Sequence, residues 1–358
     1  MKLLDKYIFK RFLTTFVFVV GLLVLIIVTI DFTEKNEKFV RNGVEGDLIF
    51  DYYLSFIPWI ANLIAPITIF IASVLVTSTM AAKTEIVAIL AGGVSFRRMM
   101  LPFFAASVLI SAGTFYANGW WIPNSNKFRI QFEIEYLKKP FYFNERDIHF
   151  KVGEDLYLYL QRYNNKSNTG YKATLEKIEN HQMKEKLTAK KMVWVDSIGK
   201  WRFKDFHRRE VTSFGEKYCT GKELDSLLNL NPEDFKNKYQ LQEAMNLDEL
   251  GEYVALLKDR GADDIAIYQN EIYIRYMTPF TAVILTLMGV AVAAEKNTRG
   301  GTGFKIALGF VIAFVFIIMF VLVKAIAEAG TMNPLLAIWI PNIVGTIVTF
   351  LLYKAVPK

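Results

Sequence analysis

The sequence predicts an α-helical polytopic membrane protein with six transmembrane helices, three on each side of an inserted antiparallel β domain. Two observations lead to this fold class. Long apolar runs without Lys, Arg, Asp or Glu lie toward both ends of the chain, whereas residues 124–275 are polar and contain short alternating stretches. The chain is 53% hydrophobic yet 22% charged, so the charge must be kept apart from the apolar runs.

Six apolar windows reach, or come near, the roughly 20 residues that a helix needs to cross a bilayer. They are Phe12–Ile30, Tyr52–Ala82, Leu101–Ile122, Tyr276–Ala294, Ile306–Val323 and Ala329–Tyr353. The predicted domains are therefore residues 1–123 with helices one to three, residues 124–246 with the β domain, and residues 247–358 with a connecting helix and helices four to six. The first window is too long for a cleaved signal peptide and lacks a cleavage site.

The distribution of Lys and Arg predicts the orientation, because short cytoplasmic loops are enriched in these residues. With the N-terminus inside, twelve of them lie in inner segments: Lys2, Lys6, Lys10, Arg11, Lys83, Arg97, Arg98, Lys296, Arg299, Lys305, Lys354 and Lys358. Four lie in the short outer loops: Lys35, Lys38, Arg41 and Lys324. Both termini are therefore expected in the cytoplasm and the β domain outside. The net charge of +7 then reflects topology and not nucleic-acid binding.

The first helix is expected to continue past Ile30 into water. Acidic residues stand four positions before basic ones three times, at Asp31–Lys35, Glu34–Lys38 and Glu37–Arg41, and such pairs stabilise a helix. Two interpretations stay open. The pairs neutralise an exposed helix end, or Lys35, Lys38 and Arg41 meet an anionic lipid headgroup.

The inner segment Lys83–Met99 predicts a short capped helix between two spans. Thr84 is expected to cap its start, and Glu85 lies in its first turn. Gly92 and Gly93 end it, and Ser95 caps the next helix. Such a helix either docks another protein or lies on the lipid interface.

The insert predicts an antiparallel sandwich or jelly roll. Strands are expected at Asp147–Val152, Asp155–Tyr163, Tyr171–Ile178, Leu187–Val195 and Lys200–Phe206. The apolar face of these strands forms either a closed core or a groove for lipid. The only cysteine, Cys219, allows no disulfide within the chain. Asn246 and Glu249 form a capping box that opens the connecting helix.

No catalytic, metal-binding or cofactor-binding pattern is found in the sequence. The three histidines lack the spacing of metal ligands, and the glycine-rich segment Glu295–Lys305 lacks the spacing of a phosphate-binding P-loop. The predicted spans contain no ionisable residue of the kind that proton-driven carriers use. If the protein performs work, we expect the energy to come from a partner through the short inner helix.

Three stretches resemble the LptF/LptG permease family, the membrane subunits of the lipopolysaccharide-exporting ABC transporter. They are the opening Leu4-Asp5-Lys6-Tyr7-Ile8, the inner segment from Thr84-Glu85-Ile86-Val87 through Gly92-Gly93-Val94-Ser95, and Leu247–Gly261 followed by Tyr268–Val292. The likeness extends over the whole chain in order, and the opening and tail lean toward LptG.

The resemblance implies that the inner helix couples to a cytosolic ATPase subunit, LptB, with Glu85 matching the family's acidic residue. It implies a periplasmic β-jellyroll that passes lipopolysaccharide to LptC and LptA, and a second permease of the same family. Lys38 matches a basic residue that meets lipid A phosphates, whereas Asp31 and Glu37 replace lysines of LptG-type sequences. The contact then shifts to Lys35 and Arg41 or to the partner permease.

The expected function is therefore a permease subunit in the bacterial inner membrane that extracts lipopolysaccharide and is not itself an enzyme. Two alternatives remain. The chain is the permease of another lipid or lipoprotein ABC exporter, or a membrane-anchored periplasmic scaffold.

Overall fold

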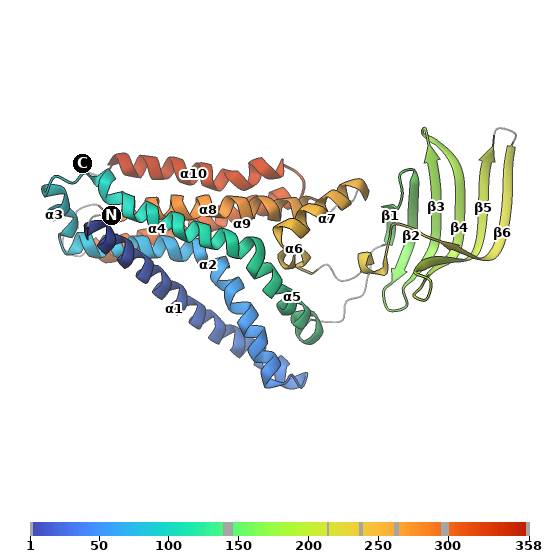
Figure 1. The fold of residues 1–358 in the computed structure, drawn as a ribbon, viewed down its shortest axis with the longest axis horizontal. Helices are drawn as coiled ribbons and strands as arrows, with labels where there is room; N and C mark the ends of the chain where they lie inside the picture. The colour runs from blue at the N-terminus through green and yellow to red at the C-terminus, as the bar shows by residue number, and fades with distance from the viewer. Residues whose placement is uncertain are drawn as a thin grey trace. The chain divides into compact units, whose positions relative to one another are not determined.

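The computed structural model describes residues 3–138, 146–212, 215–235, 239–260, 265–294 and 301–355. The chain divides into two compact units. The helical unit comprises Met1–Lys138, Gln240–Gly251 and Ala266–Lys358, and the β unit comprises Lys139–Tyr239 and Glu252–Ile265. Figure 1 labels the helices and strands of both units.

The first half of the helical unit contains five α-helices. They are α1 (Leu3–Arg41), α2 (Gly46–Ala82), α3 (Glu85–Ala91), α4 (Phe96–Tyr116) and α5 (Ile122–Phe132). The π-helical segments η1 (Ala117–Trp121) and η2 (Glu133–Leu137) follow α4 and α5, so this part of the chain runs on as one long helix. Helix α1 extends well beyond its apolar run to Arg41, as the acid-before-base spacing predicts. In Figure 1, α2 bends along its length, and it contains Pro58 and Pro66.

The remaining helices are α6 (Leu241–Ala244), α7 (Leu247–Arg260), α8 (Ile265–Ala293), α9 (Gly301–Glu328) and α10 (Pro334–Ala355), and α7 belongs to the β unit from Glu252 onward. The predicted capping box forms at the start of α7. The Asn246 amide donates to Glu249 Oε2 at 2.9 Å, and the Glu249 amide donates to Asn246 Oδ1 at 2.8 Å. Two donors that a helix start leaves without partners are thus satisfied.

Five of the described helices are long and apolar enough to cross a membrane: Leu3–Arg41, Gly46–Ala82, Phe96–Leu137, Ile265–Ala293 and Pro334–Lys354. The protein is thus an integral membrane protein. The predicted window Ile306–Val323 falls in α9, where several side chains lie outside the described residues, so the total of six spans stays a prediction. Most of the glycine-rich segment Glu295–Lys305 also lies outside them.

The main core of the helical unit lies where α2, α4 and α8 meet. Phe70, Phe103 and Val290 are fully buried there, and Phe12 of α1 packs against Phe103 with ring centroids 5.4 Å apart. Helices α2 and α8 approach each other closely at Gly289, where an added Cβ would lie 1.9 Å from Ser73 Oγ and 3.1 Å from the carbonyl oxygen of Phe70. Only glycine allows the two backbones to pack this tightly.

The β unit contains six strands that pair in chain order, each antiparallel to the next: β1 (Arg146–Lys151), β2 (Leu156–Asn164), β3 (Thr169–Glu179), β4 (Gln182–Val195), β5 (Lys200–Thr212) and β6 (Gly215–Ser226). The antiparallel arrangement was predicted. The jelly-roll topology is not what the described strands form, because a jelly roll has two packed sheets joined by Greek-key connections. These strands form one continuous meander, visible side by side in Figure 1.

One face of this sheet is a closed core over β2 to β5. Leu158, Leu160 and Phe203 are buried on it, and the segment after β6 covers them with Leu228, Leu230 and Phe235. Phe235 stacks on Tyr163 with ring centroids 3.7 Å apart, and Trp201 Nε1 donates to the Leu230 carbonyl at 2.7 Å. The apolar alternation of β2 therefore serves packing at this place and not an open groove.

Candidate functional site

The predicted coupling residue Glu85 lies at the start of α3, where it is tied to α1. Tyr7 Oη donates to Glu85 Oε2 at 3.1 Å, and Arg11 Nη1 forms an ion pair with Glu85 Oε2 at 3.2 Å. The side chains of Arg11 and Glu85 are 22% and 27% exposed, so the ion pair is reachable from solvent. Helix α3 and the first turns of α1 are thus joined through one carboxylate.

The other residues predicted near Glu85 form the turns that bound α3. Gly92 and Gly93 end the helix as predicted, and Gly93 has a φ of +80°, which favours glycine. Ser95 caps α4 as predicted by accepting a hydrogen bond from the Arg98 amide at 3.3 Å. The predicted side-chain cap by Thr84 was wrong. Its φ is +60°, a strained conformation for a β-branched residue, and its hydroxyl donates to the Lys83 carbonyl at 2.6 Å.

A second ion pair fixes the same end of α1 to α4. Arg98 donates to both carboxylate oxygens of Asp5, at 2.9 and 2.8 Å, and Asp5 is buried. Bidentate arginine–carboxylate pairs are among the stronger charged contacts. Next to it, Leu3, Leu4, Tyr7, Glu85, Ala88 and Ile89 line a hollow of about 430 Å³. Charged groups therefore hold α1 to α3 and to α4 here, and the hollow lies between α1 and α3.

The basic residues predicted to meet a headgroup lie at the opposite end of α1, and they differ in their contacts. Lys35 Nζ lies 2.7 Å from Asp31 Oδ1 and donates to Tyr52 Oη at 2.6 Å, with its side chain 22% exposed. Lys38 and Arg41 are exposed, and neither forms an ion pair with any described residue. Of the three acid–base pairs at i,i+4 spacing, only Asp31–Lys35 forms an ion pair among the described residues. Lys38 and Arg41 thus present their charges at the surface of the described residues.

A buried charge network beside Lys35 was missed by the sequence reasoning. Tyr52 Oη donates to Glu133 Oε1 at 3.2 Å, and Arg129 Nη1 donates to the same oxygen at 3.1 Å. Arg129 is 1% exposed, although arginine is rarely buried unless paired. The i,i+4 spacing of Arg129 and Glu133 in the sequence could have predicted their ion pair. It was overlooked because these residues fall in the polar segment that was assigned to the insert.

Glu243 of α6 completes this network from the other side. Its Oε2 accepts hydrogen bonds from Arg129 Nη2 at 2.9 Å and from Trp59 Nε1 at 2.9 Å. The Arg129 guanidinium also stacks over the Trp59 ring at 4.2 Å. Burial raises the pKa of Glu243 above the usual glutamate value, and the positive charge of Arg129 opposes that shift.

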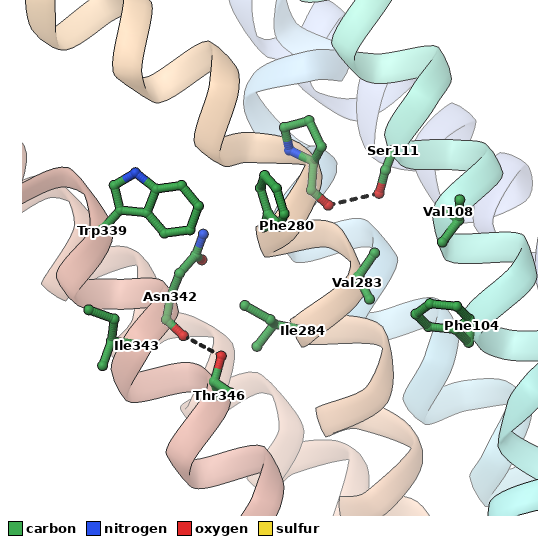
Figure 2. A pocket seen from close by; sticks show the side chains of 11 residues that line it. Phe104, Val108, Ser111, Phe280, Val283, Ile284, Trp339, Asn342, Ile343 and Thr346 are labelled. Carbon is green, nitrogen blue, oxygen red and sulfur yellow. Dashed lines mark hydrogen bonds between the residues drawn. The ribbon is translucent and has the colours of Figure 1, made fainter. Parts of the chain in front are cut away.

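A groove of about 510 Å³ lies between α4, α8 and α10 (Figure 2). It is lined by Phe104, Val108, Ser111, Pro279, Phe280, Val283, Ile284, Trp339, Asn342, Ile343 and Thr346. Its two hydroxyl groups already have partners: Ser111 donates to the Pro279 carbonyl at 2.8 Å, and Thr346 donates to the Asn342 carbonyl at 2.7 Å. The groove therefore offers apolar surface and few free hydrogen-bonding groups.

No group of three or more His, Cys, Asp or Glu side chains among the described residues is arranged to hold a metal ion. The family model described as lipopolysaccharide export system permease LptF/LptG matches residues 6–355, which is nearly the whole chain. None of the curated proteins compared with the chain matches it.

Proposed function

Because this chain belongs to the LptF/LptG family of lipopolysaccharide export permeases, we propose that it extracts lipopolysaccharide from the inner membrane and passes it to a periplasmic bridge. The observation that carries the proposal is the family match over residues 6–355 in a chain with five described helices fit to cross a membrane. The chain is a transport subunit, and ATP is hydrolysed on a separate LptB-like subunit.

The need for an external motor follows from the energetics of the substrate. Moving an acyl chain out of the membrane costs about 0.8 kcal/mol for each CH₂ group. A lipid with several chains therefore needs far more free energy than thermal motion supplies. The proposed entry point for that energy is α3, with Glu85 in its first turn.

The orientation belongs to the proposal. Both termini and α3 lie in the cytoplasm, and the β unit lies in the periplasm, in keeping with the excess of Lys and Arg in the short inner loops. The β unit hands lipid to LptC- and LptA-like β proteins, and antiparallel edge strands such as β6 suit pairing with another sheet.

Helix α1 supports the proposed pairing with a second permease around the lipid. Only 11% of its most apolar window is buried, and Val17 and Phe18 in its middle are 66% and 68% exposed. Such a surface suits acyl chains or another apolar helix. At its end, Lys38 and Arg41 provide positive charge for lipid A phosphates, and Lys35 contributes less because Asp31 and Tyr52 already engage it.

The experiment purifies the complex in mild detergent, quantifies the retained ATPase and identifies the retained lipid by mass spectrometry. We expect lipopolysaccharide with the wild-type chain. Glu85→Gln should lower ATPase retention at least about tenfold, since it removes the charge presented to the partner. Arg11→Gln is the matched control, because it removes the ion pair with α1 but keeps the Glu85 carboxylate and its hydrogen bond from Tyr7.

The outcomes separate the proposal from its rivals. Recovery of lipoprotein alone would favour a different exporter. Unchanged ATPase retention in Glu85→Gln would favour a membrane-anchored scaffold. Equal losses in Glu85→Gln and Arg11→Gln would mean that the intramolecular contact, and not a partner, explains the effect of Glu85.

A further inference from the structure

The short helix α6 is held by two fully buried arginines. It spans only Leu241–Ala244, too short to be stable by itself. Arg275 donates to its C-terminal carbonyl groups, to Gln242 O at 2.9 Å and to Met245 O at 2.7 Å. Arg129 binds the side chain of Glu243 at 2.9 Å. Both arginines are 1% exposed.

Helix α6 lies at the point where the chain returns to the helical unit from the strands. Gln240 is the residue at which the chain re-enters the helical unit after the six strands, and Lys138 is the residue at which it leaves. Arg129 lies on α5, which leads directly through η2 to Lys138. The exit and the return of the chain are therefore bridged within the helical unit by one guanidinium group.

The bridge is reinforced by a second contact between the same two segments. Asn126 Oδ1 accepts a hydrogen bond from Arg129 Nε at 3.0 Å, and Asn126 Nδ2 donates to the Glu243 carbonyl at 3.1 Å. Asn126 is buried as well. The amide thus holds the arginine in place and binds the backbone of α6 directly.

The same guanidinium group is connected to α2 and through it to α1. Trp59 of α2 stacks on Arg129 and donates to Glu243. Glu133, the second carboxylate on Arg129, accepts from Tyr52 of α2, and Tyr52 accepts from Lys35 of α1. A continuous series of hydrogen bonds thus joins α1 and α2 to the exit and the return of the chain.

Stability alone does not require charged groups at this place. Apolar side chains of similar volume often stabilise a protein as well as a buried ion pair does, because burying charges is costly. What a planar five-donor guanidinium adds is a fixed geometry between several partners at once. Arg129 has four such partners, Asn126, Glu133, Gln240 and Glu243.

We propose that Arg129 is a positioning residue. It holds α5, through which the chain leaves the helical unit, and α6, through which it returns, against α2, and it transmits movement of the membrane helices to α5 and α6. This inference rests on the proposed function, since movement of the membrane helices is useful only if it drives transport. Arg129 touches neither the lipid nor the ATPase in this scheme and acts through the segments that it joins.

The test compares Arg129→Gln with Lys127→Gln in the full chain. Lys127 lies on the same helix and pairs with Glu249 at 2.7 Å, but both side chains are close to half exposed, and such pairs contribute little. Hydrogen–deuterium exchange of residues 240–246 is measured on the purified chain in detergent. We expect exchange to rise at least about tenfold in Arg129→Gln and to stay within about twofold in Lys127→Gln.

The second measurement uses the assembled complex with lipopolysaccharide and records lipid transferred per ATP hydrolysed. We expect at least about a fivefold loss for Arg129→Gln with ATPase activity retained, partial recovery in Arg129→Lys, and no loss for Lys127→Gln. If Arg129→Gln does not fold, Glu243→Gln replaces it with the same expectations, since it removes the charge and keeps the shape of the partner.

Unchanged hydrogen–deuterium exchange at residues 240–246 in Arg129→Gln would contradict the proposal that Arg129 holds α6 in place. Faster exchange with normal transfer per ATP would overturn its part in transmission. A wild-type complex that transfers no lipopolysaccharide would contradict the proposed function instead, and the exchange result would still decide whether Arg129 holds α6 in place.

Discussion

Helices α1 and α2 lie next to each other in the sequence but differ in how much of their surface the chain covers. In the most apolar window of α2, 67% of the residues are buried, against 11% in α1. Phe70 of α2 is fully buried, whereas Phe18 of α1 is 68% exposed. In Figure 1, α1 lies at the edge of the helical unit. The chain thus covers most of α2 but leaves most of the middle of α1 exposed.

The ends of α1 explain how so uncovered a helix stays attached. Asp5 and Arg11 connect its N-terminal end to α4 and α3 through ion pairs. Lys35 connects the other end to Tyr52, and Phe39 packs there in an aromatic cluster with Phe132. Helix α1 is therefore attached at both ends and largely exposed between them, where Val19 and Val24 are its buried residues.

The largest effect is expected from a matched pair of glycine substitutions, which tests whether α2 is packed more tightly than the middle of α1. In Gly289→Ala the new Cβ meets Ser73 and the Phe70 backbone of α2, so we expect a loss of about 2 kcal/mol, typical of overpacking. In Gly21→Ala, in the middle of α1, the new Cβ meets nothing within 4 Å. The higher helix propensity of alanine should then leave stability unchanged or raise it by up to about 1 kcal/mol.

The measurement for both glycine variants is the midpoint of thermal unfolding of the purified chain in detergent. Equal destabilisation by the two substitutions would mean that α1 is packed as tightly as α2, against the comparison.

A smaller effect is expected from the ion pair that holds the N-terminal end of α1. Arg98→Gln leaves the buried Asp5 carboxylate without its bidentate partner. Because Arg98 is 38% exposed, solvent screens part of the loss, and we expect only a small decrease in the unfolding midpoint. Asp5→Asn in the same chain should recover most of it, since no unpaired buried charge then remains.

A double-mutant cycle on unfolding midpoints checks this coupling. Additive effects of Arg98→Gln and Asp5→Asn would show that the pair does not hold α1.

The sequence was sufficient for the features that depend on local periodicity. The apolar windows, the extension of α1 to Arg41, the glycine end of α3 and the capping box at Asn246 all follow from residue spacing along one helix. The first five strands were found for the same reason. Strand β6 was missed because its side chains are mostly exposed, so it lacks the apolar alternation that marks the other strands.

Features that depend on contacts between distant segments could not be predicted. The spacing of Asp31 and Lys35 predicted their ion pair, but only the fold brings Tyr52 to the same ammonium group. Likewise, Arg129 and Glu243 are more than a hundred positions apart, and all six strands lie between them in the chain. The conformation of Thr84 depends on the turn between α2 and α3, which overrides its preference for capping.

The most direct test of the account is photo-crosslinking in native membranes from Phe18 of α1, with Phe350 of α10 as an equally apolar control that is 55% exposed. We expect adducts with lipopolysaccharide or a second permease from position 18. From position 350 we expect only bulk phospholipid. Bulk phospholipid alone from both positions would contradict the claim that the uncovered middle of α1 is the working surface of this permease.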